Sequence, residues 1–164
     1  MKANRSLAVS LLAIGSLAGT TEQNGTGQVS VQLGWGCIDV PASYRVVNLR
    51  TDIIDQTYGY IAGPSQPRVE WSFGMSEAHP LCHHGCKTVW RRREFLGCRD
   101  REVGLMLDQG VRVYFAVDQW ISFRVDAAAP SALEYLKQVV ARYHPGDNRV
   151  KCQPAEIEEM QHAF

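Results

Sequence analysis

The sequence lacks a surplus of charge of either sign. Among its 164 residues, Lys and Arg together number 17, and Asp and Glu together also number 17. Proteins that bind nucleic acid usually carry a basic excess, because they neutralise phosphates. The balance therefore predicts no nucleic-acid partner. The 45% of hydrophobic residues is typical of a globular domain rather than a disordered chain.

Long hydrophobic runs are also missing. The most apolar stretch, residues 7–19, has 13 residues, whereas a helix needs about 20 to span a bilayer. It follows two cations, Lys2 and Arg5, and ends in a Ser-Leu-Ala triplet that signal peptidase accepts. We therefore expect residues 1–18 to be a cleaved signal peptide. The mature chain would then be periplasmic or secreted, with no membrane anchor.

Recognisable catalytic motifs are absent as well. The chain holds no Walker loop, no dinucleotide fingerprint and no Gly-x-Ser-x-Gly elbow. Asp52 and Asp55 lie close in sequence, but the two carboxylates of a glycosidase must face each other across a cleft. A polar turn is the better interpretation of this pair. The sequence therefore favours a non-enzymatic protein over a hydrolase with an unrecognised site.

The predicted export determines the redox state that we expect for the cysteines. In an oxidising compartment, paired cysteines form disulfides by default. An odd number leaves at least one thiol free or bonded to another chain, and the sequence does not give the pairing. The five cysteines are Cys37, Cys82, Cys86, Cys98 and Cys152.

Most of the chain alternates apolar and polar residues with a period of two. Val69, Trp71 and Phe73, for example, alternate with polar residues, which is typical of a half-buried antiparallel strand. The predicted strands cover residues 35–40, 44–49, 57–62, 68–73, 88–95, 101–107, 111–117 and 121–125.

One segment has helical spacing. Ser131 and Glu134 form a predicted capping box, and Pro145-Gly146 ends the helix. Its apolar stripe consists of Leu133, Leu136, Val140 and Tyr143. Strands followed by a helix predict an α+β fold, with an antiparallel sheet of about seven short strands covered by the C-terminal helix.

The predicted organisation is a single domain over residues 32–146. Residues 19–31 are rich in Gly, Thr and Gln and read as a flexible lead-in. Residues 147–164 read as a polar C-terminal tail, with a weak helical stretch over residues 154–160.

Several short motifs carry a family resemblance. The segments Gly36–Pro41, Gly59–Ile61, Val69–Gly74 and Trp90–Gly97 resemble a group of uncharacterised exported bacterial proteins. The resemblance covers roughly residues 33–145. It implies an architecture similar to PsbP-like α/β/α sandwiches, and it transfers no catalytic residue.

A dense cluster of metal-ligand types follows the fourth predicted strand. It contains His79, Cys82, His83, His84 and Cys86, whose imidazoles and thiolates suit zinc or copper. A structural zinc site usually has a second pair of ligands; here only Cys98 or His144 would complete it. The better interpretation is an exposed loop with Cys82 or Cys86 in a disulfide and no cofactor.

Two further groups of residues read as structural. Three consecutive arginines, Arg91–Arg93, are expected on a solvated strand with cross-strand ion pairs, with Arg92 facing away from the other two. The tryptophans, at positions 35, 71, 90 and 120, are expected to pack in the sheet rather than stack on sugars.

Taken together, these features of the sequence predict an interaction or accessory module with an envelope-protein partner. The alternative is a periplasmic zinc- or copper-binding protein.

Overall fold

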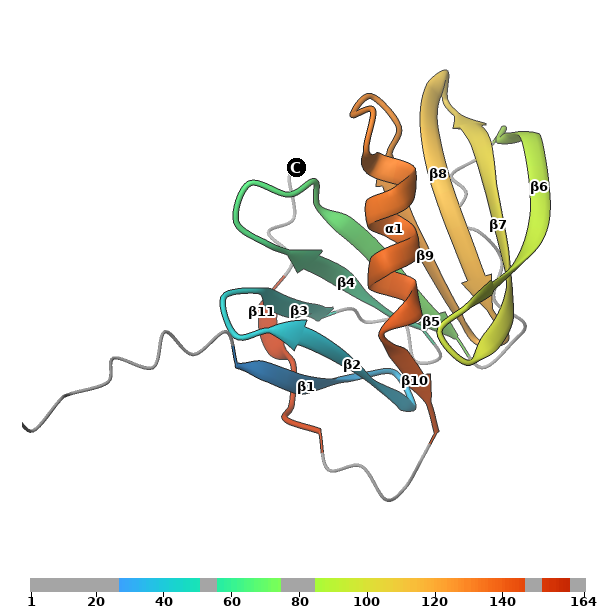
Figure 1. Ribbon diagram of the computed structural model, residues 1–164. Coiled ribbons are helices and arrows are strands. Elements are labelled where there is room, and N and C mark those ends of the chain that lie inside the picture. Colours follow the sequence, from blue (N-terminus) through green and yellow to red (C-terminus); the bar gives the residue numbers. More distant parts are fainter. Residues whose placement is uncertain (1–26, 51–55, 75–84, 147–151, 160–164) are drawn as a thin grey trace, which may run out of the picture.

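Over the residues that the structure describes, the protein is mostly β structure, in two sheets with a single short helix (Figure 1). The computed structural model describes residues 27–50, 56–74, 85–146 and 152–159. The predicted α+β fold with about seven antiparallel strands is therefore wrong. Within the described residues, an eight-stranded mixed sheet and a three-stranded sheet contain eleven strands.

The larger sheet contains seven of the eight predicted strands and one strand that was not predicted. Its order is β11-β3-β4-β5-β9-β8-β7-β6. The first predicted strand, residues 35–40, forms β2 of the smaller sheet instead. The bounds of the strands in the larger sheet are β3 Arg45–Arg50, β4 Gln56–Ala62, β5 Val69–Gly74, β6 Lys87–Leu96, β7 Arg99–Asp108, β8 Val111–Asp118, β9 Ile121–Asp126 and β11 Glu156–Glu159.

The sheet is mixed because β11 runs parallel to β3. Every other pair of neighbouring strands in this sheet is antiparallel. The weak helix predicted over residues 154–160 is therefore replaced by a strand. A helix this short has little stability of its own. The strand gains backbone pairing with β3, and Arg45 binds the carboxylates of Glu156 and Glu158.

The smaller sheet consists of β1 Gln28–Leu33, β2 Gly36–Pro41 and β10 Tyr143–Pro145. Residues 28–31 of the first of these strands lie in the predicted flexible lead-in, which is therefore ordered there. Its polar residues hid a period of two, in which Val31 and Leu33 are buried. Gln153 pairs with the outer edge of β1, because its backbone N–H donates to Ser30 and its carbonyl accepts from Gln32.

The helix, α1, spans Ala132–Ala141 and begins without the predicted capping box. Ser131 is the N-cap residue, but its side chain makes no capping hydrogen bond. A tight turn, in which the N–H of Ala132 donates to Ala129, starts the helix instead. Tyr143 was expected on the helix stripe, but it belongs to β10 and is buried through that strand.

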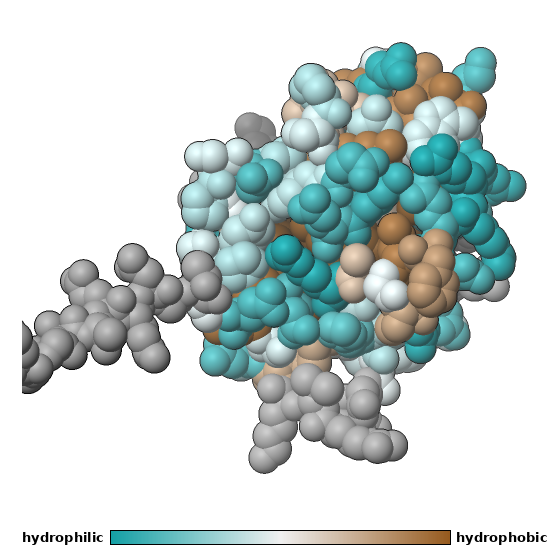
Figure 2. Space-filling view, viewed as in Figure 1, coloured by the Kyte–Doolittle hydropathy of each residue, from teal (hydrophilic) through white to brown (hydrophobic). Residues whose placement is uncertain are grey.

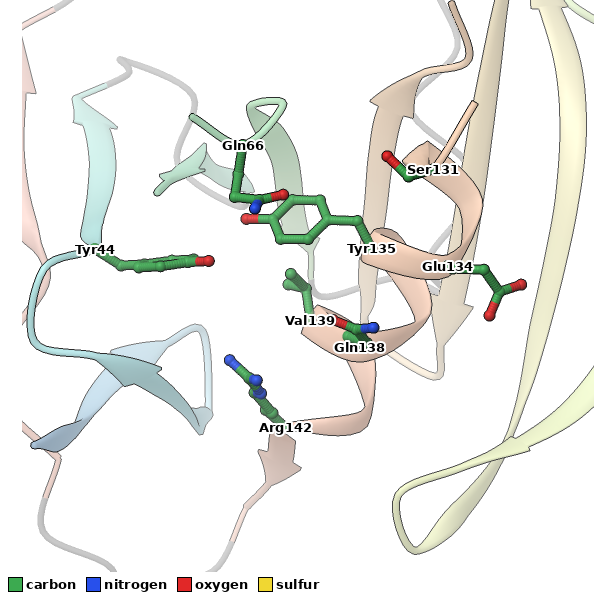
Figure 3. A pocket seen from close by; sticks show the side chains of 8 residues that line it. All are labelled: Tyr44, Gln66, Ser131, Glu134, Tyr135, Gln138, Val139 and Arg142. Carbon is green, nitrogen blue, oxygen red and sulfur yellow. The ribbon is translucent and has the colours of Figure 1, made fainter. Parts of the chain in front are cut away.

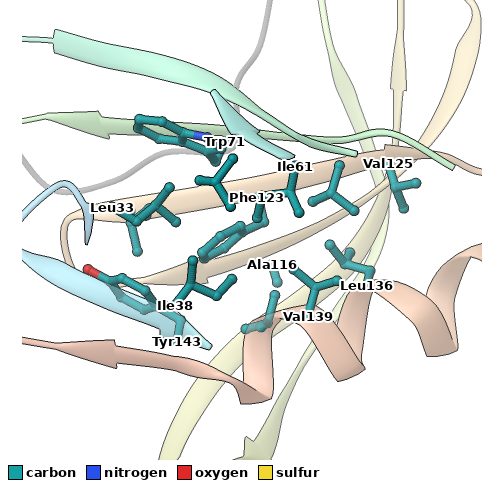
Figure 4. Close-up of a cluster of buried hydrophobic side chains, with 14 of the residues drawn as sticks. Leu33, Ile38, Ile61, Trp71, Ala116, Phe123, Val125, Leu136, Val139 and Tyr143 are labelled. Atoms are coloured by element: carbon teal, nitrogen blue, oxygen red, sulfur yellow. The ribbon is translucent and has the colours of Figure 1, made fainter. Parts of the chain in front are cut away.

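The core lies between two layers. The eight-stranded sheet forms one layer, and α1 together with the smaller sheet forms the other (Figure 4). Trp71 and Phe123 from the large sheet meet Ile38 from β2 and Leu136 from α1. Each of these four residues is fully buried, so this interface holds most of the apolar burial.

A disulfide joins Cys37 of the smaller sheet to Cys152, with 5.9 Å between their Cα atoms. This pair at disulfide distance agrees with the expected presence of a disulfide and is compatible with an oxidising compartment. Cys98 is free and exposed in the β6–β7 turn. No helix among the described residues is long and apolar enough to cross a membrane.

Candidate functional site

The candidate site is a pocket of about 300 Å³ beside α1 (Figure 3). It opens where the helix meets the turns that precede β3 and β5. Its lining is mainly polar and comes from widely separated parts of the chain. The lining residues are Tyr44, Gln66, Ser131, Glu134, Tyr135, Gln138, Val139 and Arg142.

Tyr135 is the buried group of this pocket. It lies in the first half of α1, and 8% of its surface is exposed. Its hydroxyl oxygen is buried and lies beside the Tyr44 hydroxyl, but it makes no hydrogen bond of normal length. Burial raises the pKa of the phenol, and the neighbouring Tyr44 hydroxyl raises it further. The group is therefore a neutral donor at physiological pH.

Tyr44 forms the opposite wall. Its backbone N–H donates to Pro41, which closes the turn between β2 and β3. Its ring lies against Gly63, where the Cβ of any larger residue would overlap the ring. In Figure 3 its hydroxyl points toward that of Tyr135, and Gln66 lies above the gap. The turn and the glycine therefore fix a second phenol at the pocket.

The charges around the pocket favour an anionic ligand. Arg142 follows the last turn of α1 and is the single cation of the lining. Its guanidinium points toward the space below Tyr44 (Figure 3). Glu134 is the single anion, but its carboxylate points away and pairs with Lys137 at 3.2 Å. The groups that face the space can thus supply hydrogen bonds to an oxygen-rich ligand.

The predicted metal cluster falls mostly outside the described residues. The members of the cluster that lie outside the described residues are His79, Cys82, His83 and His84. Cys86 is described: it packs against the cluster of Met106, Val113 and Phe115 and is bonded in a disulfide. Within the described residues no group of three or more ligand-type side chains gathers. The two other residues that were considered as ligands lie apart in the fold, Cys98 in the β6–β7 turn and His144 on β10 beside Asp39.

The arginines lie on β6 as expected. Arg91 pairs across the strands with Glu102 at 3.7 Å, and Arg92 pairs with Glu94. The pair Asp52 and Asp55 falls outside the described residues.

The tryptophans have more than one environment. Trp71 is fully buried, as predicted. Trp35, however, lies in the β1–β2 turn with 56% of its surface exposed, and its ring contacts Phe73 at 5.0 Å. Trp120 lies in the β8–β9 turn, so Trp35 and Trp120 both lie in turns rather than in strands.

Sequence reasoning missed the pocket entirely. Its residues belong to two turns and to α1 with the residues at its two ends, and no spacing in the sequence connects them. Tyr135 offered one weak signal, because it lies in the helix outside the predicted apolar stripe. Comparison of the chain with protein-family models, with curated proteins and with solved structures finds no match.

Proposed function

We propose that this chain is an exported, non-enzymatic binding module whose pocket takes a small ligand bearing a carboxylate. Export is supported by the apolar run at residues 7–19 and by the Cys37–Cys152 disulfide. The accessory role in the envelope is supported by the same features. The observation that carries the ligand proposal is the buried, unpartnered hydroxyl of Tyr135.

A ligand oxygen would complete the hydrogen bonding of this hydroxyl. A buried polar group without a partner costs about 1–3 kcal/mol, and an acceptor from a ligand would recover part of that energy. Gln66 is exposed, so rotation of its side chain would open the way to Tyr135. Arg142 would then bind the charge, since hydrogen bonds to ionised groups are stronger than neutral ones.

The metal-binding alternative, with zinc or copper held by residues of the 79–86 cluster, receives less support. A disulfide at Cys86 removes one of its proposed thiolate ligands. Mass spectrometry of the untagged protein, together with a count of free thiols, tests this alternative. One free thiol and no metal would exclude it, whereas stoichiometric zinc or copper lost in a Cys82→Ser, Cys86→Ser variant would establish it.

The carboxylate proposal is tested by titrating the isotope-labelled protein with N-acetylglycine and observing its NMR spectrum. N-acetylglycinamide is the matched neutral probe. We expect the acid alone to shift the amide signals of α1 and of residues around Tyr44. Tyr135→Phe and Arg142→Gln should weaken this binding, while Tyr114→Phe, outside the lining, should not.

Stability measurements separate a binding role from a structural one. Tyr135→Phe removes a hydroxyl that has no partner, so the free energy of unfolding should be unchanged or should rise by up to about 1 kcal/mol. If both probes shift the same signals equally, or if Tyr135→Phe binds the acid as well as the wild type does, the proposal is wrong.

A further inference from the structure

The eight-stranded sheet ends in two edge strands of opposite charge. At one edge, β6 carries Lys87 and three arginines against a single acid, Glu94. At the other edge, β11 reads Glu-Ile-Glu-Glu. Figure 1 places the two strands at opposite sides of the molecule, and Figure 2 shows mainly hydrophilic side chains on the β6 side. The edges therefore differ in sign while belonging to one continuous sheet.

The register of the sheet aligns these charges in rows. Paired residues of neighbouring strands point to the same face, so each row can be followed across the sheet. One row consists of Glu156, Val47, Tyr60, Glu70, Arg124, Phe115, Gly104 and Arg91. The next row consists of Glu158, Leu49, Tyr58, Ser72, Ser122, Val117, Glu102 and Arg93.

Both rows start with a glutamate and end with an arginine on the same face of the sheet. The strand directions match as well. Six antiparallel steps separate β3 from β6, so β6 runs in the same direction as β3 and therefore as β11. If the edge of a second molecule continued this sheet, Glu156 would lie beside Arg91 and Glu158 beside Arg93.

The side chains involved are accessible to a partner. None of the ten residues of β6 is buried, and 68% of the Arg91 side chain is exposed. The side chains of Glu156 and Glu158 are 53% and 38% exposed, although both contact Arg45. Ile157, between them, is 73% exposed. Both edges thus present charged groups that a second chain can contact.

Pairing of β6 with another β6 is disfavoured, because registers centred on Arg91–Arg93 bring arginine opposite arginine. We infer that β6 binds β11 of a second copy of this chain, in parallel, with each glutamate beside an arginine. This contact joins different surfaces of the two molecules, so it leaves one free edge of each kind and can repeat. Because neighbouring strands are rotated by roughly 20–25°, successive copies would follow a helical path. The inference is independent of the pocket beside α1.

Association through these edges should be weak and sensitive to salt. A four-residue strand buries far less than the roughly 1,200 Å² of a stable interface, and exposed ion pairs are screened by salt. Sedimentation of the mature chain up to millimolar concentration should therefore show oligomers that grow with concentration at about 0.01 M salt. They should dissociate at about 1 M salt, where the Debye length is about 3 Å.

Two variants test the pairing of the edges. Arg91→Gln with Arg93→Gln removes the basic edge, and Glu156→Gln with Glu158→Gln removes the acidic edge. Each variant alone should associate roughly two- to thirtyfold more weakly than the wild type, because two exposed ion pairs are lost. Mixed together, they should form a 1:1 dimer that does not grow, because each supplies the edge that the other lacks. Arg112→Gln, on an exposed arginine of β8, is the control and should associate as the wild type does.

The outcomes that overturn the inference are distinct. A wild-type protein that stays monomeric at low salt would overturn it, as would a closed dimer that does not grow. Unchanged association of the Arg91→Gln, Arg93→Gln variant would also overturn it. This arginine variant suffices if the glutamate variant fails to fold through loss of the contacts with Arg45.

Discussion

Two regions of the molecule differ sharply in how far their side chains are buried. In the region under α1 and the smaller sheet, side chains such as Trp71 and Phe123 are fully buried between two layers. In the β6–β7 arm, Lys87–Asp108, the outer strand β6 has one neighbouring strand in the described part of the chain, and none of its residues is buried. The difference indicates that the covered region supplies most of the stability, while the arm offers a surface for contacts.

The end of the arm at the β6–β7 turn is an exception to this division. The Arg101 guanidinium is fully buried and donates from Nε to Asp118 at 3.0 Å. It also donates to the carbonyl oxygens of Leu96 and Tyr143, which ties the arm to the smaller sheet. A buried ion pair that is supported by further hydrogen bonds, here three from one guanidinium, holds its surroundings in one arrangement.

The largest contrast is expected between two phenylalanines. Phe123→Ala empties a site at the centre of the core and should lower the free energy of unfolding by about 3–5 kcal/mol. Phe95→Ala, in the arm, should change it by less than about 0.5 kcal/mol, because 70% of Phe95 is exposed. Urea denaturation of both variants measures the difference. Equal losses would show that the arm belongs to the stabilising core.

The ion pair between Arg101 and Asp118, at the turn end of the arm, should rank next. Arg101→Leu leaves the buried Asp118 carboxylate and two carbonyl oxygens without their partner, at a cost of about 3–5 kcal/mol. Arg99→Leu is the control, since that guanidinium is half exposed and lies 3.8 Å from Asp118. Thermal unfolding of both variants gives the comparison, and similar melting temperatures would contradict it.

The disulfide should stabilise the covered region. Cys37→Ser with Cys152→Ser opens a link across 115 residues and should cost about 2–5 kcal/mol. Cys98→Ser should leave the free energy of unfolding nearly unchanged, because that thiol is exposed and free. Titration of free thiols in the wild type should also give one per chain. A larger number would mean that one of the disulfides does not form in the protein.

The smallest effect concerns Glu94, where the arm contacts α1. Desolvation raises the pKa of Glu94, but hydrogen bonds from Lys137 and Arg92 outweigh it and lower the pKa below its ordinary value of 4.5. A lowered carboxyl pKa stabilises the folded state above the ordinary pKa, and this stability is lost as pH falls through the folded-state value. Glu94→Gln should therefore cost up to about 1 kcal/mol at pH 7.

The same variant should unfold like the wild type once the pH is below the folded-state pKa of Glu94. Unfolding in urea over a series of pH values measures this convergence. A constant difference at all pH values would mean that Glu94 acts through packing rather than through its charge.

The sequence alone determined eight of the strands and the helix. Val69, Trp71 and Phe73 recur every second residue, and an extended strand places such residues on a single face. The odd cysteine count required an unpaired thiol, and Cys98 is free. The expected separation of Arg92 from its neighbours follows from the same alternation. These features are local or purely numerical, so neighbouring residues are enough to specify them.

Tertiary structure alone decided which distant segments meet. Strand β11 forms because β3 supplies backbone partners and Arg45 binds its acids, although its local sequence favours a helix. Likewise, Tyr44 and Tyr135 meet at one pocket only because α1 lies over the turns of the sheet. Pairing and packing between residues some 90 to 110 positions apart depend on the whole fold, and no periodicity in the sequence records them.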